Sequence, residues 1–198
     1  AAAAMKQIAK SGKKILFVAT KKQAKGVIAE TALALNMPYI TERWPGGLLT
    51  NFATIRKSIK KMQTIDKMKE NGTFDSLSKR ERLQIDRQRA KLDLNLGSIV
   101  KMTRMPEAVF IVDTGKENIA LAEANKLGIR SFAMNDTNTN PNLVSFPIPS
   151  NDDASKSIQC IMSIVKSAIA EGLEERGADQ EAKAVEKKEK AKKITEEK

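Results

Sequence analysis

The sequence predicts an α/β fold: a doubly wound, mainly parallel sheet of the Rossmann or flavodoxin type, with an inserted antiparallel coiled-coil helical hairpin. Short apolar runs alternate with stretches of helical spacing, which is typical of a parallel sheet covered by helices on both faces. A long charged stretch with a narrow apolar stripe interrupts this alternation. The chain of 198 residues, 41% of them hydrophobic, is long enough for one substantial core.

The first β-α unit is predicted near the start of the sequence. After a helical approach that begins with four alanines, residues 13–19 (KKILFVA) are expected to form a buried strand. Residues 20–35 then show apolar positions at helical spacing, and Asn36 and Pro38 end this helix. Residues 37–41 are expected to form a second short strand before the loop RWPGG.

The interruption spans residues 51–104 and is predicted to be a helical arm. An apolar stripe runs from Phe52 to Ile65 in steps of three or four residues, which indicates a first helix. Ser78 and Glu81 form a capping-box pattern that begins a second helix. Two such helices, each with an apolar seam and a basic exterior, favour an antiparallel coiled-coil hairpin.

The sheet pattern resumes after the arm. Strands are predicted at residues 108–113, 129–135 and 143–147, with a helix over 116–127 that ends at Gly128, and with Asp152-Asp153 beginning a last helix to about Gly172. The α/β body is therefore assigned to residues 1–50 and 105–176, the arm to 51–104 and a charged tail to 177–198, where Glu, Lys and Ala dominate.

Positive charge is concentrated in the first half of the chain. The formal net charge is +11, yet residues 1–104 contain 22 basic and 8 acidic side chains whereas residues 105–198 contain 13 and 16. Basic side chains that neutralise phosphates release condensed counterions, so the first half is expected to face a polyanion.

Several classes of site lack the residues they need. Histidine is absent, which excludes Ser-His and Cys-His nucleophilic pairs and removes the usual nitrogen ligand of zinc. Neither GxGxxG nor GxxxxGK[ST] follows a predicted strand. We therefore predict no catalytic residue, no metal site and no cofactor, and we expect that the chain is not an enzyme.

The single cysteine and the hydropathy bear on the compartment. Cys160 excludes an internal disulfide and lies among apolar neighbours in a helix-like segment, so it is expected to be a buried structural thiol. No run of 18 apolar residues and no signal-type segment is present. These features favour a cytoplasmic protein without a membrane partner.

Two predicted strands end on carboxylates, in Val112-Asp113-Thr114 and Asn135-Asp136-Thr137. Such a pair can coordinate a divalent cation or act as an acid and a base, because open α/β sheets bind ligands at this edge. The favoured interpretation is that both carboxylates cap helices or order the strand-to-helix turns.

Two further segments are candidates for contact with phosphates or bases. Lys21 and Lys22 follow the first strand at a helix N-terminus, where a phosphate is as plausible a partner as solvent. In the segment ERWPGGLLTN, Arg43 is expected to stack on bases or sugars, because the paired glycines allow close approach. Trp44, the only tryptophan, is instead expected to plug the junction between body and arm.

The arm carries most of the candidate RNA contacts. Its basic residues are Arg56, Lys57, Lys60 and Lys61 on the first helix, and Lys79, Arg80, Arg82, Arg87 and Arg89 on the second. Over residues 54–104, basic side chains outnumber acidic ones 14 to 6. This excess is greater than helix salt bridges require, so a phosphate-facing arm is favoured over a merely solvated one.

The motifs FVATKKQAK, RWPGGLLTNFATIRKSIKKM, MPEAVFIVDT and PIPSNDDA resemble the bacterial small-subunit ribosomal protein S-two family, over about Gly12 to Ile169. The resemblance implies a structural constituent of the small ribosomal subunit that is cytoplasmic and ribosome-bound. It would bind 16S-type small-subunit rRNA between head and body and help dock the largest small-subunit protein, supporting translation without forming a homo-oligomer.

The resemblance also implies which residues contact RNA, and where this sequence departs from the family. By position, the implied contacts are Lys21, Lys22, Arg43, Asn51, Arg56, Lys57 and the other basic residues of the arm. The family normally begins with a further strand and helix, so its N-terminal part is expected to be missing here. Asn140 and Asn142 stand where the family often has aspartates, which weakens the idea of a metal site in that turn.

Two other hypotheses remain open at the level of sequence. One is an α/β enzyme that acts on a phosphorylated ligand near Thr20, Asp113 and Asp136. The other is an interaction scaffold that dimerises through the hairpin as a coiled coil.

Overall fold

Five strands form one parallel sheet in the order β2-β1-β3-β4-β5. In this computed structural model the backbone is described for residues 1–196, and the side chains for residues 1–180 except Asp75. The strands are β1 (Ile15–Val18), β2 (Tyr39–Ile40), β3 (Ala108–Val112), β4 (Arg130–Asn135) and β5 (Phe146–Pro149). This is the flavodoxin-like order, in which the winding direction reverses between β1 and β3.

The central strands are buried on both faces, as their continuous apolar runs predict. Every residue of β1 and β3 is buried. Phe17, Phe110 and Phe132 point into one core layer, whereas Leu16, Val109 and Ala133 point into the other. Successive strand residues alternate between the faces of a sheet, so each strand contributes to both layers.

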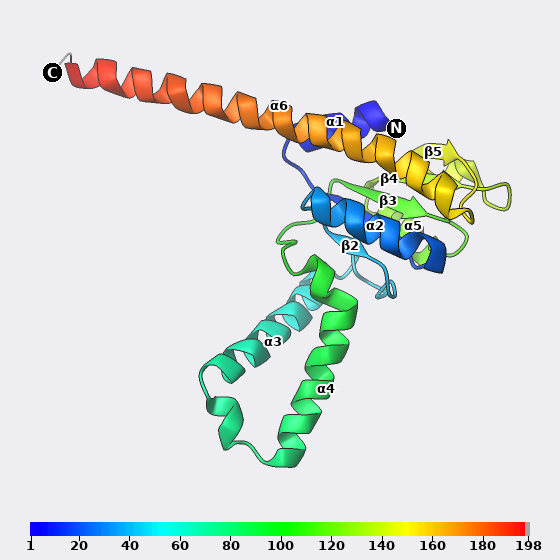
Figure 1. Cartoon of the computed structure of the whole chain (residues 1–198), viewed down its shortest axis with the longest axis vertical. Coiled ribbons are helices and arrows are strands. Elements are labelled where there is room, and N and C mark those ends of the chain that lie inside the picture. Colours follow the sequence, from blue (N-terminus) through cyan, green and yellow to red (C-terminus); the bar gives the residue numbers. More distant parts are fainter. Residues whose placement is uncertain (197–198) are drawn as a thin grey trace.

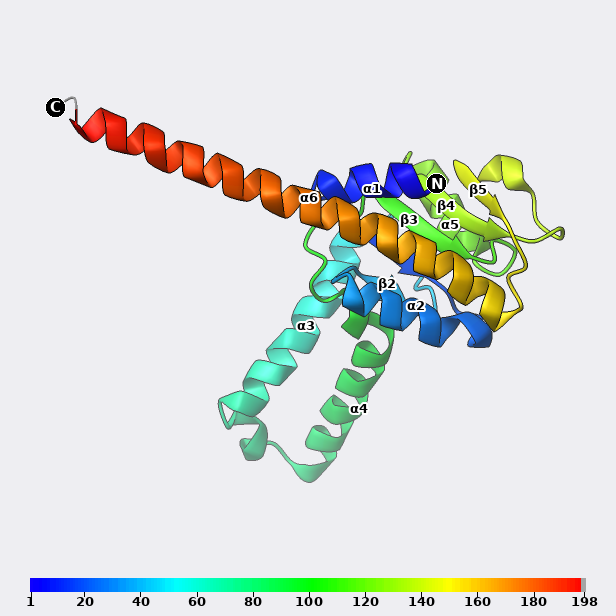
Figure 2. The ribbon, with the colours of Figure 1, turned by 45° about the horizontal axis from the view of Figure 1, so that its top comes forward.

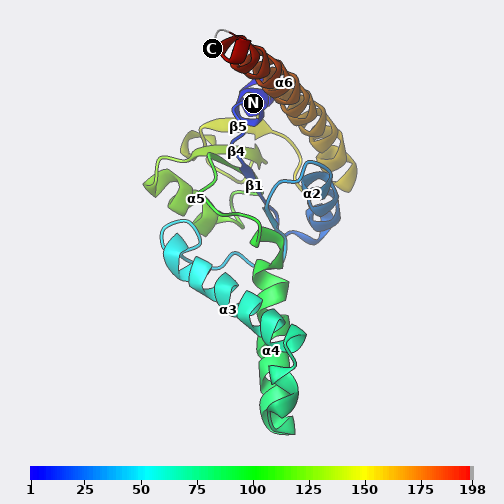
Figure 3. The ribbon, with the colours of Figure 1, turned by 90° about the vertical axis from the view of Figure 1, so that its left-hand side faces the viewer.

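Helices cover both faces of the sheet (Figures 1 and 3). The first face is covered by α1 (Ala2–Lys10), α2 (Lys22–Ala34) and α6 (Ser155–Glu196), which lie together in Figure 2. The second is covered by α5 (Asn118–Lys126) and by the root of an arm made of α3 (Phe52–Glu70) and α4 (Lys79–Leu96). Short 3-10 turns are η1 (Thr73–Ser76), η2 (Gly97–Ile99) and η3 (Pro141–Leu143). The predicted α/β class is confirmed.

Two element boundaries differ from the prediction near the end of the body. The strand predicted at 143–147 begins later, because Asn140 Oδ1 accepts a hydrogen bond from the Asn142 N–H at 3.0 Å and Pro141 opens a 3-10 turn first. The last helix begins at Ser155 and continues past Gly172 to Glu196. Asn151 Oδ1, rather than an aspartate, accepts from the N–H groups of Asp153 and Ala154 before it.

The prediction of a buried Cys160 is wrong. The side chain is exposed, because α6 turns the face with Ile158, Met162, Val165 and Ile169 toward the sheet. Cys160 follows Ile158 by two positions, about 200° around a helix, and so lies on the opposite side.

The arm is a hairpin of two helices that projects from the body (Figure 1). α3 buries Ile59, Met62 and Ile65, as its stripe predicts, and the capping box of Ser78 and Glu81 is present at the start of α4. α4 buries only Leu96. Its predicted apolar seam is only partly formed, by Ile85, Leu92 and Leu96, and coiled-coil packing is not confirmed.

Ion pairs link the two arm helices where the second apolar seam is incomplete. Arg89 Nε lies 2.8 Å from Asp66 Oδ1, and Lys69 Nζ lies 2.5 Å from Asp86 Oδ1. Leu83 and Leu94 of α4 stay 52% and 64% exposed. The inner face of α4 is therefore mixed, with the half-buried Ile85 and Leu92 beside Asp86 and Arg89.

Close contact between α1 and α6 depends on Gly172. A Cβ atom at this position would lie 2.4 Å from the carbonyl oxygen of Lys6. The same interface carries ion pairs of Lys6 and Lys10 with Glu175, at 2.8 and 2.9 Å. These contacts hold the pKa of Glu175 at about 2. α1 is thus packed against α6 backbone to backbone.

The junction between arm and body is organised by the carboxylate of Glu123 on α5. Its Oε1 accepts hydrogen bonds from Trp44 Nε1 at 3.1 Å and from the Gly47 N–H at 2.7 Å. Its Oε2 accepts from the Leu49 N–H at 2.9 Å, and from the N–H and Oγ1 of Thr50 at 3.1 and 3.2 Å. Burial opposes the charged form of Glu123, but these donors outweigh it and lower the pKa of the carboxyl.

Gly172→Ala is predicted to destabilise the fold, although alanine is the better helix former. The added Cβ would collide with the Lys6 carbonyl, and overpacking of this kind costs about 1–3 kcal/mol. The control is Gly177→Ala in the same helix, where no atom lies within 4 Å of the new Cβ. Chemical denaturation should show the first variant weakened and the second unchanged or stronger. Equal behaviour of the two would contradict the close packing.

Glu123→Gln is predicted to cost about 2–3 kcal/mol at neutral pH, because the amide cannot accept from all the donors of residues 44–50. Thermal unfolding measures the loss. The matched control is Glu174→Gln, since Glu174 is exposed on α6.

The cost of Glu123→Gln should depend on pH. The folded-state pKa of Glu123 is lowered, so its stabilisation is complete above the ordinary glutamate range and disappears as pH falls through the folded-state pKa. The difference from the parent should therefore shrink between about pH 7 and about pH 3. A difference that stays constant with pH would show that ionised Glu123 does not hold the loop.

Candidate functional site

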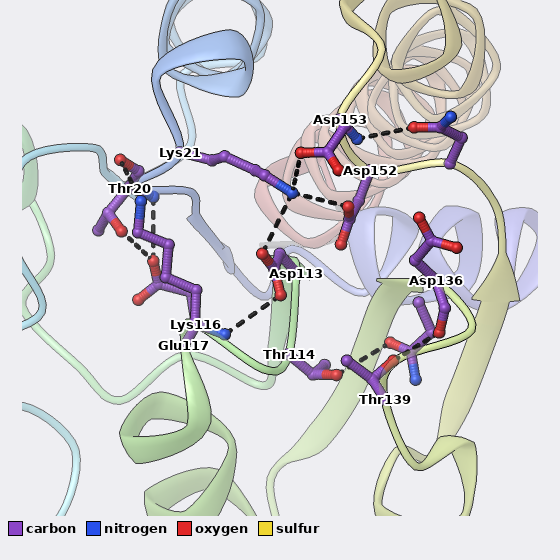
Figure 4. A network of polar contacts seen from close by, with 12 residues as sticks. Thr20, Lys21, Asp113, Thr114, Lys116, Glu117, Asp136, Thr139, Asp152 and Asp153 are labelled. Carbon is purple, nitrogen blue, oxygen red and sulfur yellow. Dashed lines mark hydrogen bonds and ion pairs between the residues drawn. The ribbon is translucent and has the colours of Figure 1, made fainter.

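A polar cluster lies at the carboxyl edge of the sheet, beside the ends of the neighbouring strands β1 and β3 (Figure 4). Lys21 follows β1, and its Nζ lies 3.2 Å from Asp113 Oδ2, which follows β3. The same Nζ lies 2.7 Å from Asp152 Oδ1 and 2.6 Å from Asp153 Oδ1, both in the loop before α6. The crevice in which flavodoxin-like folds bind ligands therefore contains an internal ion-pair cluster.

The turns around this cluster are fixed by further hydrogen bonds. Asp113 Oδ1 accepts from the Lys116 N–H at 3.1 Å. Asp136 Oδ1 accepts from the Thr137 N–H at 2.7 Å. The N–H and hydroxyl of Thr20 both donate to Glu117 Oε1. The interpretation that the carboxylate orders a strand-to-helix turn is confirmed for Asp113, which precedes α5, whereas among the described residues the carboxylate of Asp136 accepts only from its neighbour Thr137 and no α-helix follows before β5.

The charge of the cluster argues against a phosphate partner. Burial would lower the pKa of Lys21, but contacts with Asp152, Asp153 and Asp113 outweigh it and raise the pKa above its usual value. The ammonium is thus held by three carboxylates and is only 15% exposed. A phosphate beside Lys21 would meet these carboxylates, so the geometry disfavours both Lys21 as an RNA contact and the hypothesis of an enzyme acting on a phosphorylated ligand.

The two candidate residues of the RWPGG loop differ in burial. Trp44 is 7% exposed and packs in the core layer with Leu48 and Leu96, which confirms it as the plug of the junction. Arg43 is exposed beside it. Lys22, the first residue of α2, and Asn51, which precedes α3, are also exposed. These three polar side chains remain available to a partner.

The arm presents a group of exposed basic side chains. Lys57, Lys60 and Lys61 share one face of α3, because positions three and four apart are neighbours on a helix. Lys79, Arg80 and Arg87 are exposed on α4. Among the residues that the structure describes, these six make no ion pair. We call them the arm cations.

The remaining basic candidates of the arm have internal partners. Arg56 donates through Nη1 to the Met102 carbonyl at 3.2 Å. Arg89 is paired with Asp66 and, at 3.4 Å, with Asp93. Arg82 is half-buried and also interacts within the chain. These three arginines contribute to the structure of the arm, unlike the arm cations.

Sequence reasoning missed two groups of residues. Glu123 lies on the helix face that buries Ala120, Leu121 and Ala124, and an acid on such a face is the signal that identifies it. Asp152 and Asp153 were assigned to a helix start, and no sequence signal placed them beside Lys21. Pairing across 131 positions is a product of the fold.

In the described part of the chain, no helix has the length and hydropathy needed to span a membrane.

Comparison with known proteins identifies the family. The family described as "Ribosomal protein S2" matches residues 1–172. Among curated relatives, "Small ribosomal subunit protein uS2" of Flavobacterium johnsoniae is 63% identical over 183 residues, which cover 92% of this chain and 72% of the relative. The protein of the same name from Phocaeicola vulgatus is 65% identical over 179 residues, covering 90% and 64%.

The chain therefore spans about two thirds of the length of these relatives, and that of Flavobacterium psychrophilum, 64% identical, is covered to 67%. The family match extends over the α/β body and the arm alike. From these matches, the chain belongs to the ribosomal protein S2 family.

Proposed function

We propose that the chain is a structural constituent of the small ribosomal subunit and binds small-subunit rRNA through its arm. The proposal rests on membership of a family of ribosomal proteins and on relatives named as small-subunit proteins. Membership of this family also agrees with the prediction that the chain is not an enzyme. On this proposal the protein is bound to ribosomes in the cytoplasm.

The arm cations carry the RNA-binding part of the proposal. Phosphate contacts need positive side chains that are free of carboxylate partners, because an internal ion pair must otherwise be broken on binding. Lys57, Lys60 and Lys61 meet this requirement on α3, and Lys79, Arg80 and Arg87 meet it on α4. The excess of basic residues in the arm is thus directed to solvent.

Three exposed polar residues of the body extend the proposed surface. Arg43 and Asn51 lie at the root of the arm, and Lys22 begins α2. Arg43 immediately precedes the loop whose side-chain and backbone N–H groups are held by Glu123, so its position is fixed relative to α5. We assign to these residues contacts with rRNA next to the arm. Arg56, Arg82 and Arg89 are assigned a supporting role, because internal contacts already occupy them.

The finer part of the proposal concerns position in the subunit. We propose that the body and the arm together bridge the head and body of the small subunit and help dock its largest protein. In the predicted division into a body (1–50 and 105–176), an arm (51–104) and a tail (177–198), we assign the arm to RNA and the body to RNA and protein neighbours. Cross-linking on assembled subunits measures this directly, with arm residues expected on RNA and body residues on both RNA and protein.

Reversing charge on the arm is predicted to impair incorporation into small subunits. The triple variant Lys57→Glu, Lys60→Glu, Lys61→Glu should lower RNA affinity by at least about tenfold, since phosphate contacts dominate binding to nucleic acids. Sedimentation of reconstituted subunits and filter binding to small-subunit rRNA measure the two effects.

The matched control reverses Lys126, Lys156 and Lys166, which are exposed basic residues on α5 and α6. This variant has the same net charge as the arm variant and should bind nearly as the parent does. If both triple variants lost affinity equally, general charge and not the arm would be responsible.

The salt dependence of RNA binding should show how many of the arm cations contact phosphates. The log of the affinity should fall linearly with the log of salt concentration, with a slope of about 0.7–0.9 for each phosphate neutralised. The arm variant should therefore show a slope smaller by about two to three than the parent between about 50 and about 200 mM salt. An unchanged slope would mean that these lysines do not contact phosphates.

A further inference from the structure

The acidic residues around Lys21 outnumber the positive charge available to them. Asp113, Asp152 and Asp153 contact Lys21 Nζ, whereas Asp136 makes no ion pair among the described residues. Of these four aspartates, three share the single ammonium of Lys21, while Lys116 Nζ lies beside the Thr20 carbonyl and Glu117 accepts from Thr20. Figure 4 shows Asp136 and Lys21 on opposite sides of Asp152.

One oxygen of this cluster is buried without any partner. Asp152 is 1% exposed, and its Oδ1 meets Lys21 at 2.7 Å. Its Oδ2 is buried and has no hydrogen-bond donor within the described structure. A buried carboxylate oxygen is costly unless a donor or a cation satisfies it.

The geometry around this oxygen suits a metal ion. Asp136, Asp152 and Asp153 each offer one carboxylate oxygen, and the three oxygens lie within 4.8 Å of one another. Two oxygens that bind one Ca²⁺ at about 2.4 Å lie at most about 4.8 Å apart, and for Mg²⁺ at about 2.1 Å the limit is about 4.2 Å. The spacing thus lies within the upper limit for a pair of Ca²⁺ ligands, and the three side chains must move closer together to bind Mg²⁺.

The cluster is also open to solvent on one side. Asp136 lines a cavity of ≈ 510 Å³ together with Thr137, Pro149 and Ser150. Asp152 and Asp153 do not line this cavity, so it gives access to the Asp136 side of the cluster only. Both Mg²⁺ and Ca²⁺ keep waters among their ligands, and such waters need open space beside the carboxylates. Asp153, with a side chain 67% exposed, borders the same edge.

We propose that Asp136, Asp152 and Asp153 form a binding site for a hard divalent cation, Mg²⁺ or Ca²⁺, at the carboxyl edge of the sheet. Carboxylate oxygens are the ligands that these ions prefer. The ion joins the loop after β4 to the loop before α6, and it neutralises the charge that Lys21 leaves unbalanced. The proposal departs from the expectation that the chain has no metal site, because the fold brings together aspartates that lie 16 and 17 positions apart in the sequence. It is independent of RNA binding.

The test measures thermal unfolding of the purified chain with CaCl₂ or MgCl₂ at about 10 mM, against NaCl of matched ionic strength and against EDTA. A site of useful affinity should raise the Tm by about 3–6 °C, saturably, with at least one of the two ions. The response to each salt shows which ion the site prefers.

The decisive variant is Asp136→Asn. Asparagine keeps the oxygen that accepts from the Thr137 N–H but removes the charge, so the Tm in EDTA should equal or exceed that of the parent, while the rise with Ca²⁺ or Mg²⁺ is lost. Asp179→Asn, an exposed position on α6, makes the same change of charge and should keep the rise. Asp153→Asn, at a largely exposed side chain, provides a second variant in which the rise should be lost.

The proposal is overturned if the parent shows no rise beyond the matched NaCl control. It is overturned equally if Asp136→Asn and Asp153→Asn respond to the ions as the parent does. Neither outcome depends on RNA, so failure here leaves the proposed role of the arm untouched.

Discussion

The arrangement of the molecule depends on one buried carboxylate. Glu123 accepts hydrogen bonds from the indole of Trp44 and from three backbone N–H groups of the loop, those of Gly47, Leu49 and Thr50. This loop leads directly into α3, so the direction in which the arm leaves the body is set where the loop meets α5. A glutamate with several N–H donors also stays ionised in spite of its burial, because each donor stabilises the charged form. The arm is therefore oriented by this polar contact together with the apolar contacts at its root.

The positive side chains of this chain have two different kinds of surroundings. At the carboxyl edge of the sheet, Lys21 is enclosed by aspartates. Its ion pairs connect the loops that follow β1, β3 and β5. On the arm, lysines such as Lys57 and Lys61 remain without carboxylate partners among the described residues. Folds of this type usually bind an anionic cofactor at the carboxyl edge of the sheet, but here that edge is rich in carboxylates. The basic side chains suited to a polyanion lie on the inserted helices instead.

The helical arm also shows how composition limits packing. α3 supplies apolar residues for a seam, but α4 offers Asp86 and Arg89 to the same interface. Ion pairs then replace some of the apolar contacts along the hairpin, and exposed leucines such as Leu94 remain on the outer side. Exposed ion pairs stabilise weakly, so the arm depends on its buried root, where Ile59, Leu96 and Ile99 join the core layer beneath the sheet.

The sequence by itself determined the local features of this protein. Continuous apolar runs identified the strands, the Ser78–Glu81 pattern identified the start of α4, and Gly128 identified the end of α5, because these signals arise from residues close together in the chain. The distribution of charge likewise predicted that the arm faces a polyanion. Only the tertiary structure decided which polar groups meet: Glu123 with residues 44–50, and Lys21 with Asp152 and Asp153. The side of α6 that faces the sheet, and hence the exposure of Cys160, was decided in the same way. Such pairings depend on strand order and on crossover connections, which bring distant positions to one edge of the sheet. No local sequence pattern predicts these long-range contacts.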